Sequence, residues 1–590
     1  MKEHIRIFAE RKKVVVFCLV IGIITGFFEF AGLVLDELPN GITRQVILKD
    51  VLYFFLCSVF FFLLYYFRDI IMKALCFGRQ KISDSPLSRL SSTDILTNRI
   101  AVFCFIFILW IPCFLAYFPA IYSYDAEPQL IQYTMHQFDN HHPIFHTLIL
   151  GWCYDLGRML KVDGMAFYSI IQMILLDVSF TEVVITMRRK GVRKLFCAVI
   201  LIYFAVFPVH PLMAISTTKD TPFTAFIILT VVLLWRIMTS HEGQTNMLLP
   251  AEHAHMTLRT ELTLMSLSMM GMMLFRRNGV HIAGGVVIAS ILSHALNSKK
   301  EFRDKYLHIA LYSLAGIAAF MLVNTTLINI THAAAGEEAE ALSIPIQQLA
   351  RTYKSNSSTM TEEEKQELYK YLPEIALQNY RPSISDGAKQ NFNNEAYRED
   401  PKGFFKIWGH LLKKYPGSYA LATLYNTEGD WFPTDVSFSR VYKDIWRDRT
   451  GYLITDATPV FCGMDYVHKE NLLPKLRDRY EAFATGCDYS SSFLLTLMFS
   501  PAMYCLFVVY IFVWCLFLSD EKNLTIVIVP LLLNFLTILA GPCMLVRYVY
   551  PLMCSSPILW VIFVSRKEGT AEKALQGTSE ENSGVNAKIS

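Results

Sequence analysis

The segment from residue 122 to residue 148, YSYDAEPQLIQYTMHQFDNHHPIFHTL, concentrates titratable groups in an otherwise apolar chain. Among its acidic and basic side chains are Asp125, Glu127, Asp139, His141, His142 and His146. A carboxylate within hydrogen-bond reach of a hydroxyl can take its proton, so Asp125 is the candidate general base, with Glu127 orienting it. If the two lie close together, like-charge repulsion would raise one pKa and make Asp125 a better base near neutral pH.

The same segment offers a second chemistry, because nitrogen and oxygen donors suit zinc or manganese. His141 and His142 could hold a divalent metal together with Asp125 or Glu127. Adjacent histidines on a short segment rarely both bind one ion, so we assign no metal site and keep a divalent metal as an alternative. His142 is then a candidate for binding substrate. Solvated or helix-capping roles are the alternative for each of these residues.

A second polar site follows in FPVHPLMAISTTKDTPFTAF, residues 207–226, which includes Lys219 and Asp220. We expect Asp220 to be a further catalytic carboxylate or hydrogen-bond partner, and Lys219 to bind an anionic substrate group. A local role is compatible with this expectation, because Thr218 or Asp220 ahead of a proline also fits the N-terminal cap of a helix.

Three arginines add positive charge to the candidate site. Arg276 and Arg277 interrupt an apolar run in LFRRNGVHIAGG, and Arg547 lies in MLVRYVYPL. Two adjacent arginines suggest an anionic partner, and the planar guanidinium group favours phosphate. Snorkelling of these side chains toward the membrane surface is the alternative explanation.

The segment SIPIQQLARTYKSN, residues 343–356, supplies further polar donors. Gln348 and Arg351 would bind sugar hydroxyls or phosphate if this segment covers the site. An ordinary amphipathic helix packed against the membrane is the alternative.

The composition indicates what kind of scaffold must position these groups. Of the 590 residues, 53% are hydrophobic and 18% are charged, and the mean hydropathy is +0.35. Such a chain is too apolar for a soluble multidomain enzyme and is predicted to be an all-α polytopic membrane protein. The net charge of +3 does not favour a nucleic-acid partner. Cys462 and Cys487 lie in a polar segment, and their pairing in a disulfide stays open.

The apolar stretches predict about twelve transmembrane helices, because most are long enough to cross roughly 30 Å of hydrocarbon. They lie near residues 14–35, 51–67, 100–119, 165–187, 194–208, 221–238, 262–275, 279–296, 306–330, 492–518, 523–541 and 544–565. This number requires that residues 146–160, HTLILGWCYDLGRML, form a helix along the membrane surface instead of a further span.

Basic blocks fall on one side of this topology, and the positive-inside rule places that side and both termini in the cytoplasm. The polar segment before the closing helices then becomes an extracytoplasmic, mostly helical domain. The predicted parts are an N-terminal helix pair with a cytoplasmic loop (1–99), a transmembrane core with the first outer loop (100–330), the extracytoplasmic domain (331–490), the C-terminal transmembrane helices (491–565) and a disordered cytoplasmic tail (566–590).

The order of the motifs YDAEPQL, NHHPIFHTL, STTKDTPF, FRRNG and RYVYPL resembles the GT-C superfamily of membrane glycosyltransferases, which includes protein O-mannosyltransferases and the aminoarabinose transferases of lipid A. The resemblance covers roughly residues 100–565. It implies a GT-C-like fold and transfer of a hexose or pentose from a polyprenyl-phosphate donor to a cell-envelope glycan, lipid or protein. The helix pair before residue 100 and the segment 343–356 depart from the family pattern, which indicates an uncharacterised branch.

Two other functions stay open on the sequence. A polytopic transporter or flippase of lipid-linked or small solutes also fits twelve spans with charges near the membrane. An oligosaccharide polymerase or ligase would use a diphosphate-linked donor at the same face. The chain is expected in a bacterial plasma membrane, in contact with membrane lipids.

Overall fold

The computed structural model describes residues 2–41, 43–67, 94–123, 125–240, 257–436, 472–486, 492–519 and 521–564. These residues form α-helices and short 3-10 helices, with four isolated β-bridges and no β-strand among them. The predicted all-α class is therefore confirmed for the described residues. The cysteines at 462 and 487 and the predicted tail lie outside them.

Nine helical segments in the described part are long and apolar enough to cross a membrane, as expected of a multi-pass membrane protein. Eight of them lie in α1 (Lys2–Glu37), α2 (Arg44–Tyr66), α4 (Arg99–Ala116), α7 (Met165–Arg189), α10 (Asp220–Thr239), α12 (Asn278–Leu296), α13 (Lys300–Thr331) and α27 (Val546–Val564). The ninth combines the turn Lys522–Leu524 with α26 (Thr525–Leu539). The three other predicted spans correspond to α8 (Lys194–Val206), α11 (Leu258–Phe275) and α25 (Pro501–Phe517).

The most deeply buried spans are α10 and α27. Both belong to one large apolar core, which also includes residues of α4, α7, α11, α12 and α25. Asp220 is the first residue of α10, and Arg547 is the second residue of α27. Two charged residues are thus carried by the helices at the centre of the bundle, at the end where both helices begin.

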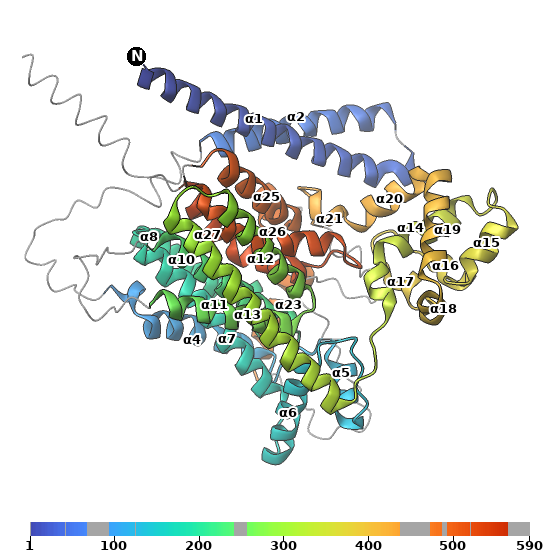
Figure 1. Ribbon diagram of the computed structural model, residues 1–590, viewed down its shortest axis with the longest axis horizontal. Helices are drawn as coiled ribbons and strands as arrows, with labels where there is room; N and C mark the ends of the chain where they lie inside the picture. The colour runs from blue at the N-terminus through green and yellow to red at the C-terminus, as the bar shows by residue number, and fades with distance from the viewer. Residues whose placement is uncertain are drawn as a thin grey trace, which may run out of the picture.

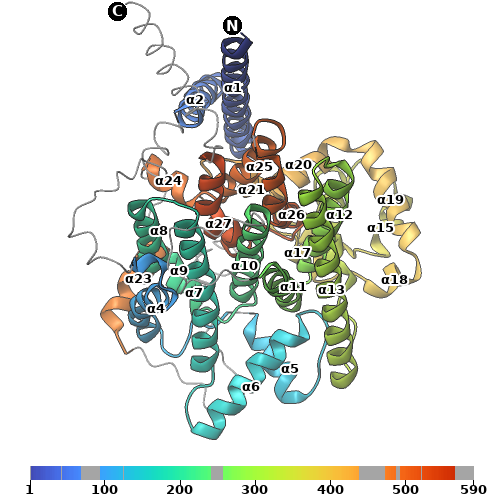
Figure 2. The ribbon, with the colours of Figure 1, turned by 60° about the vertical axis from the view of Figure 1, so that its left-hand side comes forward.

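Two shorter helices, α5 (Ala126–Met135) and α6 (Ile144–Leu160), lie together below the bundle helices in both views (Figures 1 and 2). They pack closely, because a Cβ atom on Gly151 would lie 2.1 Å from the ring of Tyr133. Residues 146–160 are helical, as the surface-helix interpretation requires, and α6 is not among the candidate spans of the described chain.

A second helical cluster lies beside the bundle, at the right of Figure 1 in yellow and orange. Its helices are α14 (Ser343–Asn356), α15 (Glu362–Tyr369), α16 (Glu374–Gln378), α17 (Asp386–Lys389), α18 (Asn394–Glu399), α19 (Pro401–Lys414), α20 (Pro416–Asn426) and α21 (Glu428–Trp431). All of them except α21 contribute to one core, built around Ile346, Leu349, Phe404, Leu411 and Tyr419. Trp431 of α21 packs with Leu35 of α1 instead. Thr361 and Glu364 form a capping box at the start of α15.

Two segments of the chain that follow α21 contact the helices of the bundle. Helix α23 (Pro474–Gly486) packs against α4, with the amide of Leu472 bonded to the carbonyl of Leu115 at 3.2 Å. On α1, the buried carboxylate of Glu29 accepts hydrogen bonds from the amide and hydroxyl of Thr434. The first span is therefore attached to the chain that follows α21.

Candidate functional site

Two distant loops are joined by backbone hydrogen bonds and bring the first two polar motifs together. Ile121 and Ser216 form a parallel β-bridge, in which the amide of Ile121 bonds to the carbonyl of Ile215 at 3.0 Å. The amide of Ser123 also donates to the hydroxyl of Thr217 at 2.8 Å. Because the loops run parallel from this bridge, the residues that follow each of them, Asp125 and Lys219, lie side by side.

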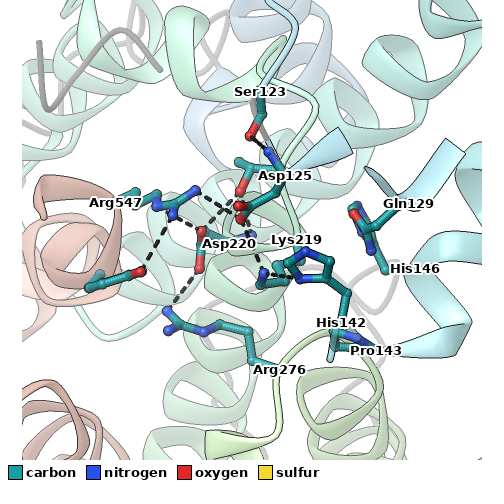
Figure 3. A network of polar contacts seen from close by, with 12 residues as sticks. Ser123, Asp125, Gln129, His142, Pro143, His146, Lys219, Asp220, Arg276 and Arg547 are labelled. Atoms are coloured by element: carbon teal, nitrogen blue, oxygen red, sulfur yellow. Dashed lines mark hydrogen bonds and ion pairs between the residues drawn. The ribbon is translucent and has the colours of Figure 1, made fainter. Parts of the chain in front are cut away.

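Asp125 lies at the start of α5 and accepts two cationic partners on one oxygen. Its Oδ2 atom is 3.1 Å from Nζ of Lys219 and 3.2 Å from Nη1 of Arg547 (Figure 3). Burial alone would raise the pKa of Asp125, but the nearby charges of Lys219 and Arg547 hold it well below the usual range. Asp125 is therefore an ionised carboxylate, and the expected rise of its pKa through Glu127 is not found.

Asp220 holds the other arginine of the cluster. Its side chain is fully buried, with Oδ1 2.8 Å from Nη1 of Arg276 and Oδ2 3.4 Å from Nε of Arg547. The hydroxyl of Thr218 donates to Oδ2 at 2.9 Å. Lys219, not Thr218 or Asp220, occupies the N-cap position of α10, and no side chain caps the helix. The carboxylate of Asp220 is directed at the two guanidinium groups instead.

Both arginines also lie over one aromatic ring. The guanidinium carbon of Arg276 lies 4.5 Å from the ring centre of Tyr548, and that of Arg547 lies 5.2 Å from it. Cations are attracted to the face of an aromatic ring, so Tyr548 helps to fix both side chains. Tyr548 was not among the residues predicted for the site. In the sequence, only its position directly after Arg547 indicates that it lies there.

His142 also contacts Lys219. The ammonium group of Lys219 lies 2.9 Å from Nδ1 of His142 (Figure 3). An ammonium group can only donate, so Nδ1 accepts and the ring proton is on Nε2. Burial, together with the charge of Lys219, lowers the pKa of His142 well below its usual value. His142 is thus a neutral side chain with a free Nε2–H donor.

His146 does not contact the charged residues directly but bonds to two neighbours of the site. Its Nδ1 is 3.0 Å from Oε1 of Gln129, and its Nε2 is 2.6 Å from the hydroxyl of Tyr168. The Tyr168 hydroxyl in turn lies 3.3 Å from the carbonyl oxygen of Thr218. Burial, reinforced by Lys219, lowers the pKa of His146 to about 3. This histidine is a neutral link between α6, α7 and the loop that carries Lys219.

The residues of the cluster do not fit a metal ion between Asp125 and His142. Lys219 occupies Nδ1 of His142, and two cations already share the Asp125 oxygen. A metal ion at this place would be repelled by the surrounding positive charge. His141 turns away from Asp125: among the described residues, its ligand atoms come within 4.8 Å of those of Glu337 and Glu340 instead.

A comparison with protein families places the chain among known sequences. The model of a family of unknown function, DUF6020, matches residues 130–576, which is more than half of the chain. The chain belongs to the DUF6020 family. No curated protein and no solved structure matches it. In this DUF6020 protein the matched range includes Lys219, Asp220, Arg276 and Arg547, while Asp125 lies just before its start.

In this DUF6020 protein one ionic cluster is formed by Asp125, Lys219, Asp220, Arg276 and Arg547. Apart from His142, which contacts Lys219, the other four predicted site residues lie outside this cluster. Glu127 is half-buried in the first turn of α5 and forms no ion pair within the described part of the chain. Arg277 is exposed and faces Glu340 and Asp139.

The segment 343–356 is the helix α14, and its two predicted donors serve the second helical cluster. Gln348 donates to the hydroxyl of Thr423 and accepts from the indole of Trp408. Arg351 donates to the hydroxyl of Tyr380 and lies over the ring of Tyr425. Neither side chain contacts Asp125 or Asp220, so the described structure places Gln348 and Arg351 away from the charges of the site.

Proposed function

We propose that this DUF6020 protein is a membrane glycosyltransferase of the GT-C kind, which transfers a hexose or pentose from a polyprenyl-phosphate donor to a cell-envelope acceptor. The observation that carries the proposal is the cluster of Lys219, Arg276 and Arg547 around two carboxylates at one end of the helix bundle. A cationic cluster at the end of membrane helices suits a phosphate whose lipid chain stays in the bilayer. The acceptor is a glycan, lipid or protein hydroxyl.

The charge balance of the cluster supports a donor with one negative charge. Among the described residues, three cations face Asp125 and Asp220 while His142 is neutral, which gives the cluster a balance of one positive charge. A sugar attached to polyprenyl phosphate is a phosphodiester with a single negative charge, whereas a diphosphate-linked oligosaccharide carries two. A ligand whose charge balances that of the site costs less to bury than a ligand that leaves excess charge. This favours the monophosphate donor over the diphosphate-linked donor of a polymerase or ligase.

In the proposed reaction the bond between the anomeric carbon and the phosphate oxygen breaks, and the acceptor oxygen bonds to that carbon. Arg276 and Arg547 stabilise the charge that develops on the departing polyprenyl phosphate, because cations held in place in advance act strongly where water is excluded. Asp125 accepts the hydrogen bond of the acceptor hydroxyl and takes its proton. Since the pKa of Asp125 is low, this transfer comes late, after the attacking oxygen has become acidic.

The distribution of basic residues supports an outward-facing site. At the end of the bundle opposite Asp125, Arg188 pairs with Asp94 at 2.6 Å, and Arg99 and Arg236 both contact Glu182. Positive charge gathers on the cytoplasmic side of bacterial membrane proteins. We therefore place the ionic cluster and the second helical cluster outside the plasma membrane, with about twelve spans and cytoplasmic termini.

A transporter or flippase is the second candidate function. Transporters bind their substrates near the middle of the bilayer, between related halves of the chain. The cluster of Asp125 and Asp220 lies instead where α10 and α27 begin, beside a helical cluster that has no counterpart elsewhere in the described chain. Both features favour the enzyme.

The test is sugar transfer by the purified full chain in lipid, with three radiolabelled donors: a polyprenyl-phosphate sugar, a polyprenyl-diphosphate sugar and a nucleotide sugar. We expect release of the sugar from the first donor alone, and its loss in Arg547→Gln. Arg158, an exposed arginine of α6, supplies the matched control as Arg158→Gln. Tight binding of the donor without turnover, unchanged in Arg547→Gln, would support the transporter and contradict the proposal.

A further inference from the structure

Three arginines meet at the end of the bundle opposite the ionic cluster of Asp125. Arg99 is the first residue of α4, Arg189 is the last residue of α7, and Arg236 lies in the last turn of α10. Glu182, one to two turns before Arg189 on α7, is the carboxylate they surround. We call these three arginines and Glu182 the basic cluster.

Two of the arginines share the one carboxylate. Nε of Arg99 lies 2.5 Å from Oε1 of Glu182, and Nη2 of Arg99 lies 3.3 Å from Oε2. Arg236 contacts the same Oε2 atom, and its Nε donates to the hydroxyl of Thr186 at 2.8 Å. Both oxygens of Glu182 are therefore engaged by Arg99 and Arg236.

The third arginine has one buried donor that no described residue accepts. Nε of Arg189 is buried and has no hydrogen-bond partner among the described residues. The charges that act on Arg189 are those of Arg99, Arg236, Glu182 and Glu261. Among the described residues, three arginines thus face two glutamates, which leaves a balance of one positive charge. A buried guanidinium donor without a partner carries a free-energy cost that an anion at this place would remove.

The position of Arg99 adds to this argument. The positive end of the α4 dipole lies at its first turn, where a cation is unfavourable and an anion is stabilised. Arg99 is also the most accessible member of the cluster, with 41% of its side chain exposed. Ile100 beside it is 75% exposed, and Phe105 and Ile108 of α4 are exposed as well. An apolar surface for lipid chains therefore begins where the basic cluster ends.

We propose that the basic cluster binds one phosphodiester group, supplied by the headgroup of an anionic phospholipid such as phosphatidylglycerol. The phosphate accepts from Arg189 and from the exposed side of Arg99, and its acyl chains lie along α4. Basic pockets between membrane helices on the cytoplasmic side are known to suit such headgroups. The site is separate from the cluster at Asp125, and the proposal does not depend on glycosyl transfer.

The experiment is hydrogen exchange of the full chain in nanodiscs, read at the backbone amides of residues 94–104. One set of nanodiscs contains phosphatidylcholine only, and the other contains phosphatidylglycerol in addition. We expect exchange in this segment to be slower by about threefold or more with phosphatidylglycerol, because a bound ligand stabilises the start of α4 against local opening. The difference should vanish in Arg189→Gln and persist in Arg158→Gln, an exposed arginine of α6.

Two further measurements distinguish the sources of the phosphate and guard against misfolding. Inorganic phosphate added to phosphatidylcholine nanodiscs should leave exchange unchanged; equal protection would identify a soluble anion and overturn the lipid assignment. Arg99→Gln provides a second variant should Arg189→Gln fail to fold, with the same expected loss. Equal exchange in both lipid compositions for the wild type, or protection that survives both substitutions, would overturn the proposal.

Discussion

Arg547 contacts Asp125 across 422 positions of sequence, with Nη1 of the arginine 3.2 Å from Oδ2 of the carboxylate. The same guanidinium group lies 3.4 Å from Asp220, so one side chain of α27 joins the loop before α5 to the start of α10. Asp125 pairs with Lys219 and Arg547, and Arg547 pairs with both Asp125 and Asp220. The site therefore exists only when the whole bundle is assembled.

Substitution of Asp125 by asparagine tests the proposed base. We expect Asp125→Asn to lower the transfer rate by about a hundredfold to ten-thousandfold, which is the usual contribution of general acid–base catalysis. The measurement is sugar transfer at saturating donor, in protein of matched folding. Asp155→Asn, a change in an exposed residue of α6, should leave the rate unchanged. Full activity of Asp125→Asn would move the base to Glu127, which lies in the first turn of α5.

Substitution of Asp220 by asparagine tests the buried ion pairs. The fully buried Asp220 compensates Arg276 and Arg547. We expect Asp220→Asn to lower the free energy of unfolding by about 3 to 5 kcal/mol, because it leaves buried positive charge without a partner. Thermal unfolding in detergent is the measurement. The double variant Asp220→Asn/Arg276→Gln should recover part of this loss, and purely additive effects of the two changes would contradict the coupling.

Acid should destabilise the protein through His146. Its folded pKa is about 3, below the unfolded value near 6.5, so the unfolded chain binds the extra proton as the pH falls below 6.5. The stability contributed by neutral His146 is complete above pH 6.5, and at pH 5 it is reduced by about 2 kcal/mol. Unfolding midpoints of wild type and His146→Gln between pH 7.5 and pH 5 give the check. The variant should lose less stability over this range; equal slopes would show that His146 does not contribute.

Removal of the ring of Tyr548 tests its contact with the two arginines. Tyr548→Phe keeps the ring over Arg276, whereas Tyr548→Ala removes it. We expect Tyr548→Ala to raise the KM for the polyprenyl-phosphate donor by about two- to thirtyfold, in line with the energy of cation–π contacts. Tyr548→Phe should stay within about twofold of wild type. Identical KM values for both variants would mean that the ring does not position the guanidinium groups.

The candidate site was predictable from the sequence to a limited extent. Asp125, Lys219, Asp220, Arg276 and Arg547 were selected by residue type and motif, and all five belong to one ionic cluster. Their partners were not predictable. The sequence suggested that Asp125 interacts with its neighbour Glu127, but the structure pairs it with residues from α27 and from the loop before α10.

His141, His142 and His146 show why. His141 approaches two glutamates of the chain that leads into α14, His142 accepts from Lys219, and His146 is buried between Gln129 and Tyr168. All three have the same side chain and lie close together in the sequence, so residue type and spacing do not distinguish their roles. Their surroundings differ because the chain turns into α6 at Ile144, after which alternate sides of the helix face the core and the solvent.

The sequence by itself determined the helical class, the membrane helices and the residues that carry charge, because helix length and apolar composition are local properties of the chain. Only the tertiary structure decided which charges meet. A carboxylate's pKa depends on the cations within a few ångströms, and those of Asp125 come from 94 and 422 positions away. No local pattern contains that information, since it arises when the bridge between Ile121 and Ser216 and the packing of α10 and α27 bring these segments together.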